Sequence, residues 1–173
     1  MRNMTNLLPR LLSCLLAATL SISMSVARAQ SDNPVENPRV LMKTTDGDIT
    51  IELFADKSPI TVENFLRYVD DGHYDGTVFH RVISNFMIQG GGFDAELKEK
   101  PTRDPIVNES KNKLHNTRGT LAMARTSDPD SAAAQFFINQ RSNLRLDWAG
   151  GKDGYTVFGE VIDGMQIVDI ISL

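Results

Sequence analysis

Residues 79–91 read FHRVISNFMIQGG and hold two short apolar runs separated by a polar Ser-Asn pair. Alternation along a strand places Arg81 on the face opposite to Val82, and it places Met87 and Gln89 together on one face of the second run. A guanidinium within an apolar strand needs hydrogen-bonding partners or an opening to water. The stretch therefore predicts two strands, with Arg81 either lining a cleft or reaching out to solvent.

The two runs of this stretch are the first of several short β-like runs over residues 77–161. Segments rich in Gly, Asp, Asn, Ser and Pro separate them, which is typical of connections between strands. The runs cover residues 77–83, 86–89, 120–124, 135–139 and 155–161. The chain after the first helix is therefore predicted to be mainly β.

A β-hairpin is predicted before them. Residues 40–44 and the alternating residues 48–53 are its two strands, and Asp46-Gly47 between them is a strong turn signal. The apolar side chains expected on its buried face are Ile49, Ile51 and Leu53.

Two helices complete the predicted elements. Ser58 and Pro59 suit the start of a helix, and Gly72 suits its end. An apolar stripe with helical spacing lies between them: Val62, Phe65, Leu66 and Val69. Residues 163–173 predict a second helix. Many short strands with one or two helices favour a β-barrel or sandwich capped by helices.

The charge of the chain excludes one class of partner. Its 173 residues carry a formal net charge of -4. Residues 1–29 hold three arginines and no acid, so the remainder carries 15 basic and 22 acidic residues, a net charge of -7. Binding to nucleic acid requires clustered basic residues, so we expect no nucleic-acid partner.

The first 29 residues have the layout of a secretory signal peptide. Two arginines precede an uncharged run over residues 11–26, and Ala27-Arg28-Ala29 provides a small-residue cleavage site. The alternatives are a membrane anchor, for which the run is short, and a lipoprotein modified at Cys14. Cleavage after Ala29 would leave a chain of 144 residues without cysteine.

Familiar catalytic constellations are absent from the sequence. It contains no G-x-S-x-G elbow, no Walker loop and no H-E-x-x-H, and its three histidines lack ligand spacing. We therefore expect neither a metal nor a cofactor.

The segment over residues 79–91 resembles the signature of the cyclophilins, the peptidyl-prolyl cis-trans isomerases. Other pieces resemble the family in the same order: Asn64-Phe65, residues 119–124, residues 135–138, Leu146-Asp147 and residues 157–159. The resemblance runs from about Val40 to Leu173. The signal peptide and the Ala-Arg pair after Met123 resemble the bacterial periplasmic branch.

This resemblance implies a mainly β fold, a closed antiparallel β-barrel capped by two helices. Residues 40–173 would be the isomerase domain and residues 30–39 a flexible leader. The family continues to a last strand that pairs with the first, whereas this sequence stops at Leu173. Either the sequence is a shortened product with an open edge at residues 40–44, or that edge is closed in another way.

The resemblance also implies the site, residue by residue. The catalytic positions fall on Arg81, Phe86 and Gln89. The substrate-binding positions fall on Met87, Ala124, Arg125, Gln135, Phe137, Leu146 and Tyr155.

Three rim positions depart from the best-known eukaryotic pattern. Arg145 stands where that pattern has Trp, Tyr155 where it has His, and Arg125 where it has Asn. The arginine and the proline pocket are kept. The departures therefore put tight binding of cyclosporin in doubt, and not the activity.

The implied function is rotation of X-Pro peptide bonds in exported proteins. The expected partners are proline-containing polypeptides in the periplasm. We expect a monomer with no stable membrane association after signal cleavage. Three alternatives stay open: a proline-peptide binding module or holdase with little turnover, a non-functional fragment, and an exported hydrolase, for which no nucleophile–base pair is visible.

We predict cleavage between Ala29 and Gln30, because the A-x-A site directly follows the apolar run. Mass spectrometry of the exported protein should show a chain that begins at Gln30. A lipidated Cys14 or a retained leader would contradict this prediction.

Overall fold

The computed structural model describes residues 37–173. The predicted signal peptide, its cleavage site and Cys14 lie outside these residues, as does most of the leader predicted over residues 30–39. Within the described part of the chain, no helix is both long and apolar enough to cross a membrane.

The described residues form seven strands, two α-helices and two 3₁₀ helices. The strands are β1 (Arg39–Thr44), β2 (Gly47–Leu53), β3 (Arg81–Ile83), β4 (Met87–Gly90), β5 (Thr120–Met123), β6 (Phe136–Asn139) and β7 (Val157–Asp163). The helices are α1 (Pro59–Asp70), α2 (Met165–Ile171), η1 (Ser110–Asn112) and η2 (Leu144–Leu146). Every predicted strand and both predicted helices are present.

Two predicted boundaries differ from the structure. β1 begins at Arg39, the last residue of the predicted leader, because Arg39 already pairs with Glu52 of β2. β3 occupies only the end of the run predicted over residues 77–83. The start of that run makes a single isolated bridge, between Thr77 and Asp94, and does not join the sheet.

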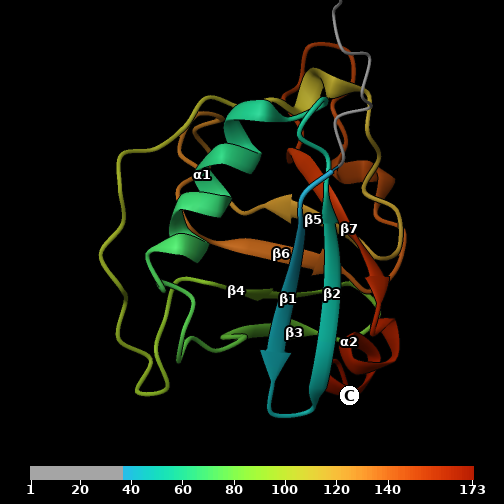
Figure 1. The fold of residues 1–173 in the computed structure, drawn as a ribbon. Coiled ribbons are helices and arrows are strands. Elements are labelled where there is room, and N and C mark those ends of the chain that lie inside the picture. Colours follow the sequence, from blue (N-terminus) through green and yellow to red (C-terminus); the bar gives the residue numbers. More distant parts are fainter. Residues whose placement is uncertain (1–36) are drawn as a thin grey trace, which may run out of the picture. The chain divides into compact units, whose positions relative to one another are not determined.

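All seven strands belong to one antiparallel sheet with the order β1-β2-β7-β5-β6-β4-β3. The sheet curls around an apolar core into a half-barrel (Figure 1). The predicted mainly β fold with two helices is thus confirmed. Among the described strands, β1 and β3 are the two edges, so the barrel is open and not closed.

The hairpin of β1 and β2 follows the sequence prediction. Thr44 pairs with Gly47 across the turn, and its hydroxyl donates to the Gly47 carbonyl at 2.6 Å. Gly47 has a φ of +138°, and a Cβ atom there would lie 2.6 Å from Cδ1 of Ile167 in α2. The residues predicted to be buried are fully buried: Ile49, Ile51 and Leu53.

The predicted boundaries of α1 are confirmed. It begins at Pro59 directly after Ser58, and Gly72 beyond its end has a φ of +65°, which glycine adopts without strain. The predicted apolar face packs on the core. Phe65 lies 5.1–5.6 Å, between ring centroids, from three aromatic residues: Tyr74, Phe136 and Phe158.

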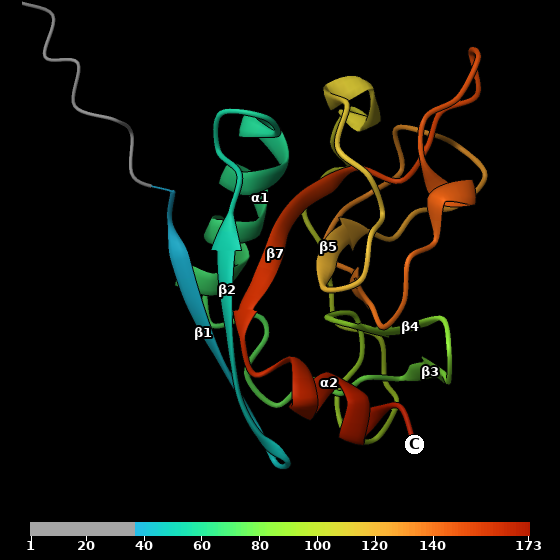
Figure 2. The same cartoon turned by 90° about the vertical axis from the view of Figure 1, so that its right-hand side faces the viewer.

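Gly164 connects β7 to α2 and lies against β2. Its φ is +88°, and a Cβ atom there would lie 2.3 Å from the Asp48 carbonyl oxygen and 2.9 Å from Ile49 Cα. These are backbone atoms of β2 at two residues that pair with β1, so moving them would disturb the pairing of the hairpin. Figure 2 shows α2 below β7, near the lower end of β2.

We expect Gly164→Ala to lower the free energy of unfolding by about 3 kcal/mol or more, because it combines a strained φ with a backbone clash. Gly150→Ala is the matched control. Gly150 also has a positive φ, +57°, but nothing lies within 4 Å of an added Cβ. That variant should lose only about 1–2 kcal/mol. Urea unfolding followed by circular dichroism measures both, and equal losses would exclude the clash as the cause.

Candidate functional site

A row of paired residues crosses four strands of the sheet. Gln89 of β4 pairs with Arg81 of β3 on one side and with Phe137 of β6 on the other. Phe137 pairs in turn with Ala122 of β5. Directly paired residues of antiparallel strands point to the same face, so this register sets Arg81 and Gln89 beside Phe137.

A cavity of about 240 Å³ opens at this row. Its lining comes from β3, the turn before β4, β4, the segment after β5, β6, η2 and the segment before β7. The lining residues are Arg81, Phe86, Met87, Gln89, Ala124, Arg125, Phe137, Leu146 and Tyr155. Nine of the ten predicted site residues therefore meet at one cavity.

Apolar side chains form the floor and walls of this cavity. Met87 and Phe137 are 2% and 4% exposed and pack against Ala122 and Val157 behind them. The Phe137 ring meets Tyr155 edge to face at 5.6 Å between centroids. The partly buried walls are Phe86, Leu146 and Tyr155. Such a surface suits a small apolar ring, which loses contact with water on binding.

A chain of polar side chains runs along one edge of the cavity. Arg81 Nη1 donates to Gln89 Oε1 at 3.2 Å, and Gln89 Nε2 donates to Gln135 Oε1 at 3.0 Å. Gln135, the tenth predicted residue, thus lies behind Gln89 and not in the lining. A Cβ atom on Gly92 would lie 2.5 Å from Gln135 Cγ, so glycine leaves the room that Gln135 occupies.

Arg81 has the exposed position that was one of the two alternatives predicted for it. All three residues of β3 are exposed, because β3 is an edge strand. The guanidinium therefore keeps contact with water while its Nη1 is held by Gln89. Both possibilities weighed from the sequence, a cleft and an exposed position, apply to this arginine.

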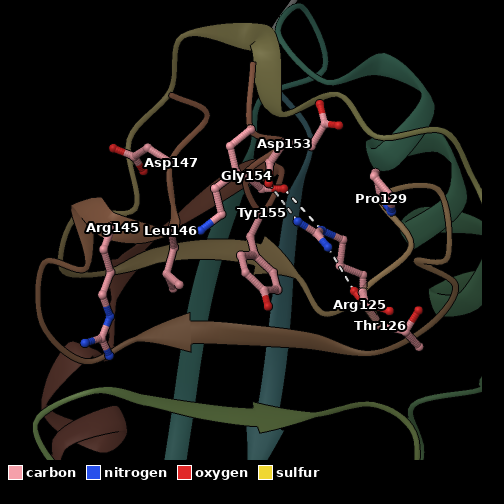
Figure 3. Close-up of a pocket in the computed structure, with 11 residues that line it drawn as sticks. Arg125, Thr126, Pro129, Arg145, Leu146, Asp147, Asp153, Gly154 and Tyr155 are labelled. Carbon is pink, nitrogen blue, oxygen red and sulfur yellow. Dashed lines mark hydrogen bonds between the residues drawn. The ribbon is translucent and has the colours of Figure 1, made fainter. Parts of the chain in front are cut away.

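Arg125 is held at the rim by backbone carbonyls. It donates to the carbonyl oxygens of Thr126 at 2.9 Å, Asp153 at 2.8 Å and Gly154 at 3.3 Å. Its Cζ atom lies 4.6 Å from the centroid of the Tyr155 ring. Figure 3 shows the guanidinium beside this ring and directed at the 153–154 backbone. The contact is a cation–π interaction that fixes one side of the cavity.

Arg145 lies outside the lining of the cavity and contacts one of its walls, Phe86. Its Cζ atom lies 5.0 Å from the centroid of the Phe86 ring. In Figure 3 its side chain extends away from Leu146 and Tyr155. Two guanidiniums therefore flank the apolar walls, one on Tyr155 and one on Phe86.

Buried amides support the walls from behind. Asn143 Nδ2 donates to the Phe86 carbonyl at 2.9 Å and to Asn139 Oδ1 at 2.8 Å. Asn139 Nδ2 donates to Asn116 Oδ1 at 3.1 Å, and both of these residues have no exposed surface. The Asn143 carbonyl accepts the Leu146 N–H at 2.8 Å. The backbones at Phe86 and Leu146 are thus joined through Asn143, and Asn139 and Asn116 hold that side chain from behind.

Asp147 ties η2 to this amide network. Its Oδ1 accepts the backbone N–H of Asn116 at 2.7 Å and Asn116 Nδ2 at 2.9 Å, and its Oδ2 lies 2.8 Å from His115 Nδ1. Burial raises the pKa of Asp147, but the hydrogen bonds from Asn116 and His115 outweigh it and hold the pKa below its usual value. An ionised Asp147 therefore stabilises the segment that carries Leu146.

Comparison with known proteins identifies the family. The sequence model for cyclophilin type peptidyl-prolyl cis-trans isomerases matches residues 39–173. The chain belongs to the cyclophilin family. It is 56% identical over 142 residues to a peptidyl-prolyl cis-trans isomerase of Acinetobacter baylyi, covering 82% of this chain and 76% of the relative. It is 56% identical over 136 residues to peptidyl-prolyl cis-trans isomerase B of Escherichia coli, covering 77% and 83%.

Solved cyclophilins share the fold. One from Cryptosporidium parvum, crystallised in the presence of the dipeptide Ala-Pro, superposes with a TM-score of 0.66 at 30% identity, covering 78% of this chain and 85% of its own. One from Hirschia baltica superposes with a TM-score of 0.67 at 24% identity, covering 78% and 67%. This cyclophilin is accordingly a peptidyl-prolyl cis-trans isomerase acting on proline-containing peptides.

Sequence reasoning missed the support behind this cyclophilin's cavity. Leu146-Asp147 is a family motif, yet nothing in the local sequence marks Asn116, Asn139 or Asn143 as its partners. These residues come together only when β5, β6 and η2 are in place.

We predict that Asp147→Asn lowers the free energy of unfolding at pH 7 by about 1–3 kcal/mol, since a charged acceptor of three hydrogen bonds is lost. The pKa of Asp147 is lowered in the folded protein. Its contribution is therefore present above its unfolded pKa, near 4, and disappears as pH falls through the lower folded value.

Unfolding at several pH values measures this effect. The difference between wild type and Asp147→Asn should shrink from pH 7 to pH 3. Asp46→Asn, at an exposed turn residue whose carboxylate has no partner among the described residues, is the control and should show no comparable loss. A difference that is constant over this range would contradict the role of the charge.

Proposed function

We propose that Arg81, Phe86 and Gln89 carry out the isomerisation and that exported polypeptides are the substrates. The observation that supports these roles is the meeting of one hydrogen-bonded guanidinium with an apolar cavity of about 240 Å³. The relative crystallised in the presence of Ala-Pro fits this assignment, because its fold is the same and its sequence is 30% identical.

The chemistry needs a polar group aimed at one atom. An X-Pro bond has partial double-bond character, with a barrier of about 18–20 kcal/mol. In the twisted transition state the prolyl nitrogen becomes pyramidal and gains a lone pair. A guanidinium near that nitrogen stabilises the twisted state more than the planar ground state, which is the requirement for catalysis. In this chain the proposed donor is Arg81.

The apolar walls and Gln89 hold the two sides of the rotating bond. Phe86, Met87 and Phe137 grip the proline ring. Gln89 Nε2 has two hydrogens and gives one to Gln135, so the other is left for the carbonyl that precedes the proline. One side of the bond is thereby fixed while the other turns.

These groups can supply the lowering of the activation free energy that the reaction needs. Uncatalysed isomerisation takes tens of seconds or more, and a turnover in milliseconds needs about 10⁴-fold acceleration. That corresponds to roughly 5–6 kcal/mol. One charged donor supplies about 2.7–4 kcal/mol when it is well placed, and orientation of the bond supplies the rest.

The periplasm is the proposed compartment. Support comes from the apolar run and the A-x-A site before Gln30, and from a mature chain without cysteine. We propose that the mature protein is a monomer that is not held at the membrane and does not bind nucleic acid. Fractionation of expressing cells tests the compartment, and a chain retained in the cytoplasm with residues 1–29 attached would contradict it.

The competing interpretation is a holdase that binds proline peptides with little turnover. A pure binder needs the apolar cavity but has no need of a guanidinium hydrogen-bonded at its edge. The two functions therefore separate at Arg81, and a variant at that position distinguishes them.

We predict that Arg81→Ala lowers turnover by about 10²–10³-fold, because the donor to the prolyl nitrogen is lost. Binding of a proline peptide should weaken much less, since the apolar walls remain. Arg81→Lys should restore little, because an ammonium lacks the planar fork of donors. A protease-coupled isomerisation assay and peptide titration give the two quantities.

Arg67→Ala is the matched control, because Arg67 lies on the exposed surface of α1 and pairs with Glu63. It should leave turnover unchanged, and circular dichroism should show that all variants fold. A folded Arg81→Ala protein with near-normal turnover would remove Arg81 from the mechanism and favour the holdase.

A further inference from the structure

The arginines of the described residues divide into two groups. Four of them form ion pairs with a carboxylate: Arg39, Arg67, Arg103 and Arg118. The other four have no ion pair within residues 37–173, and all of them lie at or next to the apolar cavity: Arg81, Arg125, Arg141 and Arg145. The arginines without an ion pair are thus concentrated around the site of an acidic protein.

A second cavity of about 380 Å³ adjoins the first at Phe86. Arg141 and Arg145 line it, together with Asn85 and the start of η2, and no carboxylate is part of its lining. Both arginines are exposed. The two cavities share Phe86, whose ring has Arg145 on it at 5.0 Å.

Asp147, two residues after Arg145 in the sequence, does not neutralise these arginines. Asp147 borders a neighbouring hollow together with Arg145, but its oxygens are engaged by Asn116 and His115. No ion pair joins it to Arg145 in the described residues. The positive charge at the second cavity is therefore available to a ligand.

β4 gives the direction in which a bound peptide runs. Gln89, proposed to hold the carbonyl before the proline, lies within β4, and Phe86 lies in the turn directly before this strand, at the edge shared with the second cavity. The peptide segment after the proline therefore leaves past Phe86, toward Arg141 and Arg145.

We propose that the cavity between Phe86, Arg141 and Arg145 is a subsite for an acidic side chain following the proline, so that substrates with Pro-Glu or Pro-Asp are preferred. This inference rests on the proposed function of Arg81 and Gln89. It makes Arg141 and Arg145 specificity-determining residues. The expected gain in affinity for an acidic residue over a neutral one is modest, because both guanidiniums are solvated. Exposed ion pairs of this kind change binding by about two- to fivefold.

The test compares peptides that differ only in the residue after the proline: Glu, Gln or Lys. A protease-free assay, such as NMR exchange, is needed because a coupled protease would itself select that residue. We expect kcat/KM for the Glu peptide to exceed that for the Gln peptide by about two- to fivefold at low salt, with the Lys peptide lowest. The preference should fade in 1 M salt, where the Debye length is about 3 Å.

Variants show which arginine causes the preference for the Glu peptide. Arg145→Gln and Arg141→Gln should each reduce the Glu-to-Gln ratio, and together they should bring it to about one. Arg67→Gln removes the same charge from α1 and should leave the ratio as in wild type. The ratio cancels any loss of turnover common to both peptides.

A peptide with Glu two residues before the proline is the positional control and should show a smaller preference. Equal rates for Glu and Gln peptides in wild type, or a preference that survives in the double variant, would overturn the subsite. A larger gain from Glu before the proline would overturn its direction. Normal turnover of Arg81→Ala would instead contradict the proposed function, so the two failures are distinguishable.

Discussion

The pairing of β4 with both β3 and β6 is the constraint on which the site depends. This pairing places Gln89 between Arg81 and Phe137. The backbone hydrogen bonds that hold the strands together do not depend on which side chains are present. A slip of one residue would turn Met87 and Gln89 to the other face and separate the guanidinium from the apolar floor. This register therefore determines the positions of the cavity, of its polar edge and of the neighbouring arginines.

Local signals were sufficient for the hairpin, for α1 and for most strand positions, because turn residues, caps and alternation act over a few residues. The resemblance placed nine of ten site residues at one cavity. Two features lay beyond it. The sequence left open whether Arg81 lines a cleft or reaches solvent, which the edge position of β3 decides, and the asparagines behind Phe86 meet only through long-range contacts.

A rigid, hydrogen-bonded region lies next to a surface of unpaired positive charge in this site. Behind the walls, buried amides and Asp147 satisfy one another, so the backbones at Phe86 and Leu146 have little freedom. In front, guanidiniums face solvent without carboxylate partners among the described residues. A stiff pocket with a charged rim can hold a proline ring in one pose while the flanking residues decide how well the peptide binds.

The dispersal of the site along the chain has a consequence for how this protein folds. Arg81 and Tyr155 lie on opposite sides of one cavity, and five of the seven strands must be paired before they meet. Sheets dominated by such non-local pairings have high contact order and fold slowly, in milliseconds to seconds. No partly folded intermediate that lacks β5, β6 or β7 can possess the cavity. Recovery of isomerase activity during refolding is therefore a late event, and it reports on completion of the sheet.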